Sequence, residues 1–198
     1  MKLESVNIRF VYCLLASALI TGMYSCNNKP ADPNNPEAVA EQHNDAKFHN
    51  DKRDDADFMV DIAVLNMEEI QLGKLAQSQG MSKDVKALGK KMEEAHSKSL
   101  EEIKKLAKNK SVTIPDALKE DSDNDYTSLK TKEGNEFDKS FCQVMTDKHK
   151  KAIEKCEKAS SDAVDIDVKN WANKTLPELR AHLDETMNCG EKYSQSGN

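Results

Sequence analysis

The sequence predicts an all-α protein: a ferritin-like four-helix bundle, with two antiparallel hairpins joined by a long crossover that holds a short helix. The composition is the first observation, because the chain is 32% charged and only 5% aromatic, which favours helices over strands. The second is that four segments repeat apolar residues at alternating spacings of three and four. The third is that the connections between these segments are short, long and short, as in ferritin-like bundles.

The first 25 residues predict a lipoprotein signal peptide. Lys2 and Arg9 give a basic start, and the apolar stretch over residues 10–20 has the length of a signal-peptide core and is short for a membrane span. Ser25 directly before Cys26 resembles a bacterial lipobox, in which the cysteine is lipidated and becomes the new N-terminus. We therefore expect the chain at the cell envelope, anchored to the outer or inner membrane through lipidated Cys26. Ordinary secretion and an uncleaved anchor are the alternatives.

Residues 26–54 predict a flexible tether. The stretch NNKPADPNNPEA holds three of the five prolines and four asparagines, a composition that disfavours regular structure. The bundle domain is then expected over residues 55–190, followed by a tail over residues 191–198.

The first predicted hairpin consists of helices over residues 57–79 and 82–109. Gly80 ends the first helix and Ser82 is a suitable N-cap for the second. The apolar stripes that define the two helices are Phe58, Ile62, Leu65, Glu69, Leu72 and Ala76, then Val85, Leu88, Met92, His96, Ser99, Ile103 and Leu106.

The second predicted hairpin follows a connection over residues 110–135, in which Pro115 opens a short helix at residues 116–129. Its helices are expected over residues 137–159 and 166–190, with Pro177 inside the second of them. The stripes are Cys142, Met145, His149, Ala152, Cys156 and Ala159, then Ala172, Leu176, Leu179, His182, Leu183, Thr186 and Cys189.

One polar residue of a metal-ligand type falls in each stripe: Glu69, His96, His149 and His182. In antiparallel hairpins, turns near residue 82 and at residues 165–166 place Glu69 opposite His96 and His149 opposite His182, all near the middle of the bundle. The second register also places Cys142 opposite Cys189, which predicts a disulfide in an exported protein and leaves Cys156 as a buried thiol.

Burying a carboxylate and three imidazoles is costly unless they are coordinated or paired. One hypothesis is a site for copper, zinc or iron, with Glu69, His96, His149 and His182 as ligands. Met92 and Met145, one turn before two of the histidines, are further candidates if the metal is copper. The alternative is a Glu/His hydrogen-bond network that only fixes helix register. A redox enzyme is a third hypothesis, but no catalytic motif names its residues.

The net charge of −6, with lysines interspersed among the acidic residues, argues against nucleic acid as a partner. No feature identifies protein partners or an oligomeric state.

Five segments together resemble the domain-of-unknown-function family 4142: NMEEIQLGKLA (66–76), residues 92–96, EGNEFDKSF (133–141), residues 145–149 and TLPELRAHL (175–183). The resemblance implies an exported or membrane-anchored ferritin-like bundle whose recurring polar core is Glu69, His96, His149 and His182. It brings no established activity. The family tends to have Asp directly before two of these histidines, where this chain has Ala95 and Lys148, so aspartates that could orient the metal ligands are missing here.

The sequence thus predicts a cell-envelope lipoprotein of uncharacterised function, with metal binding for stress or metal homeostasis as one hypothesis. The alternative is a structural or interaction lipoprotein.

Overall fold

The computed structural model describes residues 30–119 and 123–195. All regular structure in these ranges is α-helical, so the all-α prediction is confirmed. The predicted signal peptide, Cys26 and the last three residues of the predicted tail lie outside the described residues. The helices, in chain order, are α1 (Pro36–Lys47), α2 (Asp51–Gln79), α3 (Lys83–Lys110), α4 (Asn124–Lys130), α5 (Gly134–Asp162) and α6 (Ile166–Gln195).

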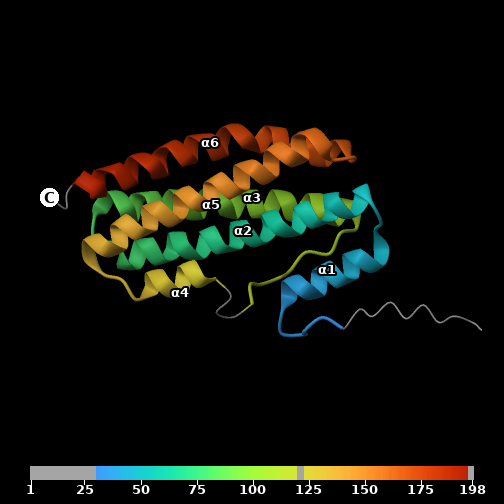
Figure 1. The fold of residues 1–198 in the computed structure, drawn as a ribbon, viewed down its shortest axis with the longest axis horizontal. Helices are drawn as coiled ribbons and strands as arrows, with labels where there is room; N and C mark the ends of the chain where they lie inside the picture. Colours follow the sequence, from blue (N-terminus) through green and yellow to red (C-terminus); the bar gives the residue numbers. More distant parts are fainter. Residues whose placement is uncertain (1–29, 120–122, 196–198) are drawn as a thin grey trace, which may run out of the picture.

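Four long helices lie side by side (Figure 1). Helix α2 packs along α3 and α5 packs along α6, and each pair is joined by a short turn. The two pairs meet where α2 contacts α5 and α3 contacts α6, while α4 lies outside, against α2 and α5. This arrangement brings all four predicted core helices to one interior.

The prediction of a flexible tether over residues 26–54 is wrong for residues 36–47 and 51–54, which are helical. The prolines of this stretch end at Pro36, which occupies the first turn of α1, where a missing N–H costs nothing. The buried Asn44 then holds the helix against the crossover, because its side chain donates to the Thr113 carbonyl (2.8 Å) and accepts from the Thr113 N–H (2.9 Å). This contact over 69 residues was not visible in the local composition.

The predicted crossover helix at residues 116–129 is also wrong in its extent, since α4 begins only at Asn124. Its N-cap is Asp123, whose side chain accepts from the Asp125 N–H at 2.9 Å. Pro115 is buried in irregular chain and does not open a helix. The hydrogen bonds of Thr113 with Asn44 occupy backbone groups just before it, which favours an extended path along α1.

Helix α6 continues to Gln195, so the bundle does not end at residue 190 and residues 191–195 are not a tail. Pro177 lies within this single helix. Near its end, the Tyr193 hydroxyl donates to Ser82 Oγ, which ties the last turns of α6 to the start of α3.

Each hairpin turn is capped by an aspartate from the other hairpin. Asp138 on α5 accepts from the N–H groups of Met81 (2.8 Å) and Ser82 (2.9 Å) in the α2–α3 turn. Asp55 on α2 accepts from Val164 (3.2 Å) and Asp165 (2.8 Å) in the α5–α6 turn. These reciprocal contacts satisfy turn donors at both ends and fix the register of the two hairpins.

The interior consists of two apolar clusters with a polar layer between them. One cluster includes Met59, Ile103 and Trp171, and the other includes Leu72, Met92 and Phe141. The buried polar side chains between them are Asn66, Glu69, His96, His149 and His182. Close contact of α2 with α3 beside this layer depends on Gly73 and Gly89, because a Cβ at Gly73 would lie 2.6 Å from the Gly89 carbonyl oxygen.

Candidate metal centre

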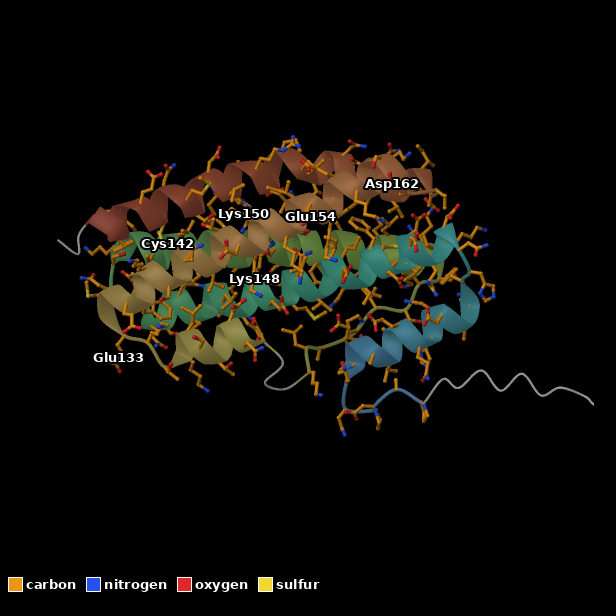
Figure 2. All side chains as sticks on the ribbon, in the orientation of Figure 1. Glu133, Cys142, Lys148, Lys150, Glu154 and Asp162 are labelled. Atoms are coloured by element: carbon orange, nitrogen blue, oxygen red, sulfur yellow. A yellow bond between two sulfur atoms is a disulfide. The ribbon has the colours of Figure 1, made fainter. Side chains whose placement is uncertain are left out.

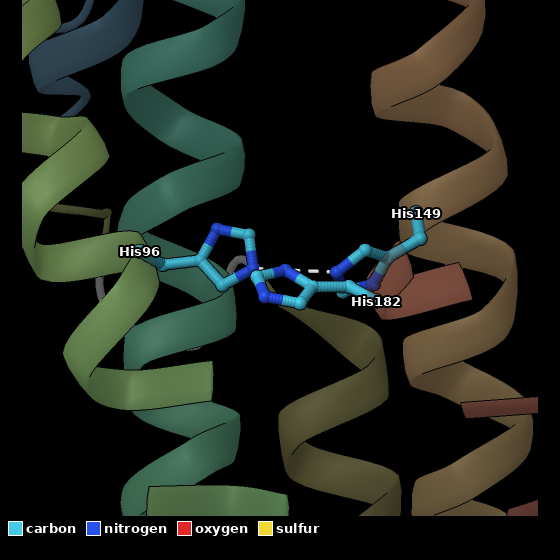
Figure 3. A group of neighbouring side chains, drawn as sticks. All are labelled: His96, His149 and His182. Atoms are coloured by element: carbon cyan, nitrogen blue, oxygen red, sulfur yellow. Dashed lines mark hydrogen bonds between the residues drawn. The ribbon is translucent and has the colours of Figure 1, made fainter. Parts of the chain in front are cut away.

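Three imidazole rings converge at the centre of the bundle, from α3, α5 and α6 (Figure 3). His149 is fully buried, and His96 and His182 are each 4% exposed. One ring nitrogen from each histidine lies within 4.8 Å of those of the other two. The fourth predicted residue, Glu69 on α2, is 1% exposed and contacts two of the rings. The register argument therefore placed all four residues at the same depth.

Asn66 sets the tautomer of His96. The Asn66 amide N–H₂ donates to the Ile62 carbonyl (2.8 Å), which leaves its oxygen facing His96 Nδ1 at 3.0 Å. We assign the proton of neutral His96 to Nδ1 on this basis, since only a donor satisfies that oxygen. The Nε2 lone pair of His96 then points into the centre.

The second ring is held in the same way by its own helix. His149 Nδ1 lies 2.8 Å from the Met145 carbonyl oxygen and donates to it, so the Nε2 lone pair of His149 also faces inward. The two Nε2 atoms are 3.4 Å apart, along the dashed line of Figure 3. Two ligands bound to one ion at about 2.0–2.1 Å with tetrahedral geometry are about 3.3–3.4 Å apart, so this spacing fits a shared cation.

The Glu69 carboxylate adds a third acceptor. Its Oε2 lies 2.8 Å from His96 Nε2 and 3.4 Å from His149 Nδ1, yet it accepts no hydrogen bond from the described residues. Burial raises the pKa of Glu69, but the positive charge that His96 and His149 can carry outweighs this effect and lowers the pKa to about 2. With that positive charge on the two rings, the carboxylate is ionised at neutral pH and supplies negative charge to the centre.

His182 is the least constrained of the three rings. Its Nδ1 is buried and has no hydrogen-bond partner among the described residues. Burial, together with the positive charge of His149 and His96, lowers the pKa of His182 to about 4. The ring is therefore neutral at pH 7, which is the form that coordinates a metal.

The two methionines proposed for copper lie in the second apolar cluster. Met92 and Met145 are both fully buried there, beside residues such as Leu72 and Phe137. Their part in a metal site stays a prediction. Met145 does contact the centre, through its carbonyl oxygen.

The cysteines are arranged as the register of the second hairpin predicts. Cys142 and Cys189 are joined by a disulfide, with their Cα atoms 5.7 Å apart. Cys156 is a buried free thiol, and burial raises its pKa to about 12, so it carries no thiolate. Cys142 lies toward the Gly134 end of α5, and Lys148 near its middle (Figure 2).

Sequence reasoning missed the role of two neighbouring residues. Asn66 precedes Glu69 by one helical turn, a spacing that could have marked it as a partner of the same site. Lys148, noted only as a departure from the family, is 8% exposed and pairs with Glu68 at 2.9 Å, Asp125 at 3.2 Å and Asp123 at 3.6 Å. At the position where the family tends to have Asp, this chain therefore has a lysine that forms ion pairs with three carboxylates.

Fold and site together define an all-α protein with a buried three-histidine cluster between facing helices. Residues 37–188 match the domain of unknown function DUF4142, so this chain belongs to the DUF4142 family, as its sequence segments predicted.

Two solved structures share the fold. One is a candidate secreted DUF305 protein from Streptomyces coelicolor, 12% identical, with a TM-score of 0.61 over 71% of this chain and 94% of that chain. The other is a DUF305 fragment from Deinococcus radiodurans, 10% identical, with a TM-score of 0.62 over 83% of this chain and 99% of that one. No curated protein matches this chain. Within the described residues, no helix is both long enough and apolar enough to cross a membrane.

Proposed function

We propose that this chain is a cell-envelope protein that binds one transition-metal cation through His96, His149 and His182, with the Glu69 carboxylate as fourth ligand. The observation that carries the proposal is that one ring nitrogen from each histidine lies within 4.8 Å of those of the other two, with the Glu69 carboxylate beside them. In the assigned tautomers, His96 Nε2, His149 Nε2 and Glu69 Oε2 all present lone pairs.

Facing lone pairs repel in a buried site unless a cation lies between them. Three imidazoles with one carboxylate suit zinc, copper or iron, and the outward N–H groups of His96 and His149 are held by the partners that metal-bound histidines usually have. His182 Nδ1, which has no hydrogen-bond partner among the described residues, offers a further ligand atom for the metal. Met92 and Met145 are candidates for an additional soft ligand if the ion is copper.

We also propose that the helices are connected as in a ferritin-like bundle and that the protein lies at the cell envelope. Two hairpins joined by a crossover with α4 correspond to a ferritin-like bundle, in which metal sites form between facing helices. The basic and apolar N-terminal segment and the Ser25–Cys26 pair support export and lipid anchoring at Cys26. The description of one structural neighbour as a candidate secreted protein agrees with export.

A second function has one observation in its favour. Glu69 Oε2 and His96 Nε2 are 2.8 Å apart, a distance that a single proton on Nε2 would turn into a buried ion pair. The polar layer would then fix helix register and the protein would have a structural or interaction role. The two functions can be distinguished because only the first requires a bound metal cation.

Elemental mass spectrometry on the purified chain separates the two functions. We expect close to one zinc, copper or iron per chain, and a loss of at least tenfold in a His149→Ala/His182→Ala variant. The matched control is His43→Ala/His49→Ala, which removes two exposed histidines outside the centre and should retain the metal. A parent protein that holds no metal, and takes up none on titration with these ions, would establish the proton-bridged network instead.

A further inference from the structure

A small cavity adjoins the centre on the side of the first apolar cluster. Residues of all four long helices line it, and its polar lining consists of Asn66, Glu69, His96, Ser99, Trp171 and Thr175. Its volume, for the centre of a water-sized molecule, is about 10 Å³, which is room for about one water. The cavity is therefore a space for one small molecule, and its wall combines these polar groups with apolar side chains such as Leu65 and Leu179.

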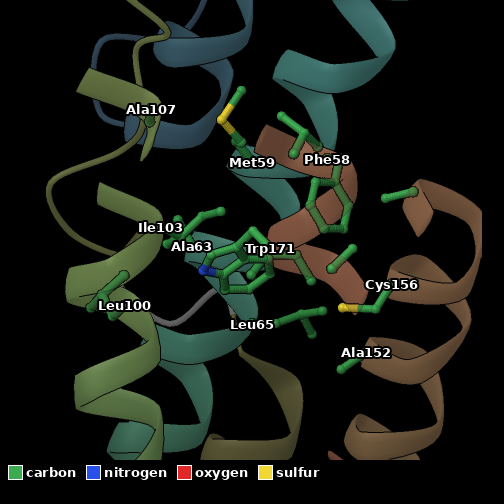
Figure 4. Close-up of a cluster of buried hydrophobic side chains, with 14 of the residues drawn as sticks. Phe58, Met59, Ala63, Leu65, Leu100, Ile103, Ala107, Ala152, Cys156 and Trp171 are labelled. Carbon is green, nitrogen blue, oxygen red and sulfur yellow. The ribbon is translucent and has the colours of Figure 1, made fainter. Parts of the chain in front are cut away.

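Two buried polar atoms of its lining residues lack hydrogen-bond partners among the described residues. One is the indole N–H of Trp171, which can only donate, and the other is the Glu69 carboxyl oxygen Oε2, which is an acceptor. Trp171 lies among apolar side chains (Figure 4), with Phe58 packed edge-on at a ring-centroid distance of 6.0 Å. Trp171 is 9% exposed and belongs to the first apolar cluster, so close packing restricts its ring.

We propose that this cavity binds one water molecule, which accepts from Trp171 Nε1–H and donates to the Glu69 carboxylate. Water suits the site because its oxygen accepts on one side while its O–H groups donate on the other. A single bound water satisfies both unpaired atoms, as buried waters generally do.

This water gives Trp171 a role in the metal centre, and that role rests on the proposed function. Residues that hold the ligands of a metal site in place usually act through one hydrogen bond to the ligand. Asn66 does so for His96, and Trp171 would do so for Glu69 through the bound water. Trp171 is thus a positioning residue that does not touch the ion.

The water site is tested first in the metal-free protein by NMR. Trp171 is the only tryptophan, so its indole N–H gives one unambiguous ¹H–¹⁵N signal. We expect a cross-relaxation peak between this proton and water in the parent chain, and its loss in Ser99→Val, which fills the cavity and keeps the indole. Thr175→Val is the matched control: it lines the same cavity, but its hydroxyl already donates to the Trp171 carbonyl at 2.9 Å, so the peak should persist.

No water peak in the parent, or an equal peak in Ser99→Val, would overturn the water site whether or not the protein binds metal. Zinc titration then tests the positioning role: Trp171→Phe and Ser99→Val should bind zinc about tenfold more weakly than the parent, and Thr175→Val should bind it equally. Equal affinities for all four proteins would overturn that role. A parent that binds no zinc, copper or iron would refute the proposed function and leave the NMR result to decide the water site.

Discussion

Two buried polar clusters lie next to each other in this bundle, and they are built from neighbouring residues. Glu68 and Lys148 form an ion pair of 2.9 Å, whereas the adjacent Glu69 and His149 face the histidine centre. In the first cluster, the lysine ammonium lies among three carboxylates and pairs with each of them, although the buried Asp123 Oδ2 has no hydrogen-bond partner among the described residues. In the second, in the tautomers assigned above, the Nε2 acceptor atoms of His96 and His149 face each other, and Glu69 Oε2 and His182 Nδ1 have no hydrogen-bond partner among the described residues.

The comparison separates two reasons for burying polar groups. A cluster in which an ammonium group already lies among the carboxylates needs no added cation, and its effect should be on stability and on the docking of α4. A cluster of acceptors that holds no cationic side chain of its own is incomplete without a proton, a water or a metal. Burial alone does not distinguish the two clusters; the presence of a cationic side chain among the acceptors does.

The largest effect is expected for Lys148→Met, in the charged cluster. Removing one partner of a buried ion pair leaves carboxylates without compensation, and we expect a loss of about 3–5 kcal/mol in the free energy of unfolding. Because Lys148 does not belong to the three-histidine group, the metal content should not change. Urea unfolding of the metal-free protein and elemental analysis measure the two effects.

The control for this variant is Lys174→Met. Lys174 also pairs with a glutamate on another helix, Glu102 at 3.0 Å, but its side chain is 68% exposed. Its loss should change the free energy of unfolding by less than about 1 kcal/mol. A Lys148→Met protein that keeps parental stability but loses its metal would show that the two clusters act as one.

The next largest effect concerns pH and the histidine layer alone. The pKa of His182 is about 4 in the folded protein and about 6.5 in an unfolded chain, so between these values the unfolded state binds more protons. The stability that neutral His182 contributes is therefore present above pH 6.5 and is lost as the pH falls to about 4. The loss should amount to about 3 kcal/mol in the metal-free protein.

Buried carboxylates titrate in the same range, so the measurement must isolate His182. Burial raises the pKa of Glu68 and of Asp55, which works in the opposite direction as the pH falls. We therefore expect the effect in the difference between the parent and His182→Gln, which carries no titrating ring. Unfolding free energies at pH 7, 5.5 and 4 should converge or cross in favour of His182→Gln as the pH falls, and parallel curves would contradict the lowered pKa.

Much of the centre could be predicted from sequence because helical periodicity is a local signal. The stripe positions of His96, His149 and His182 follow from spacing, and antiparallel geometry then brings them to one depth. The same arithmetic placed Cys142 opposite Cys189. These predictions needed only the helix period and the position of two turns.

What could not be predicted depends on contacts between distant segments. Residues expected to be a tether form α1, which is held by the hydrogen bonds between Asn44 and Thr113. No local sequence pattern predicts this pairing. The local sequence gives no reason to expect Lys148 in the interior, because only the fold places Asp123 and Asp125 beside it. The assignment of the Asn66 oxygen to His96 depends on which carbonyl its amide donates to, and that is a matter of side-chain geometry.

Asn66 provides the smallest and most selective test, because it touches the histidine centre and is not part of the Lys148 cluster. Asn66→Leu removes the acceptor that holds His96 Nδ1–H, so the ring loses its fixed tautomer, and we expect metal affinity to fall about 10–100-fold. Asn66→Asp restores an acceptor and should recover most of this loss. Isothermal titration with zinc measures both variants. If Asn66→Leu binds zinc as tightly as the parent, the orientation of His96 does not depend on Asn66, and the tautomer on which the facing lone pairs rest is wrong.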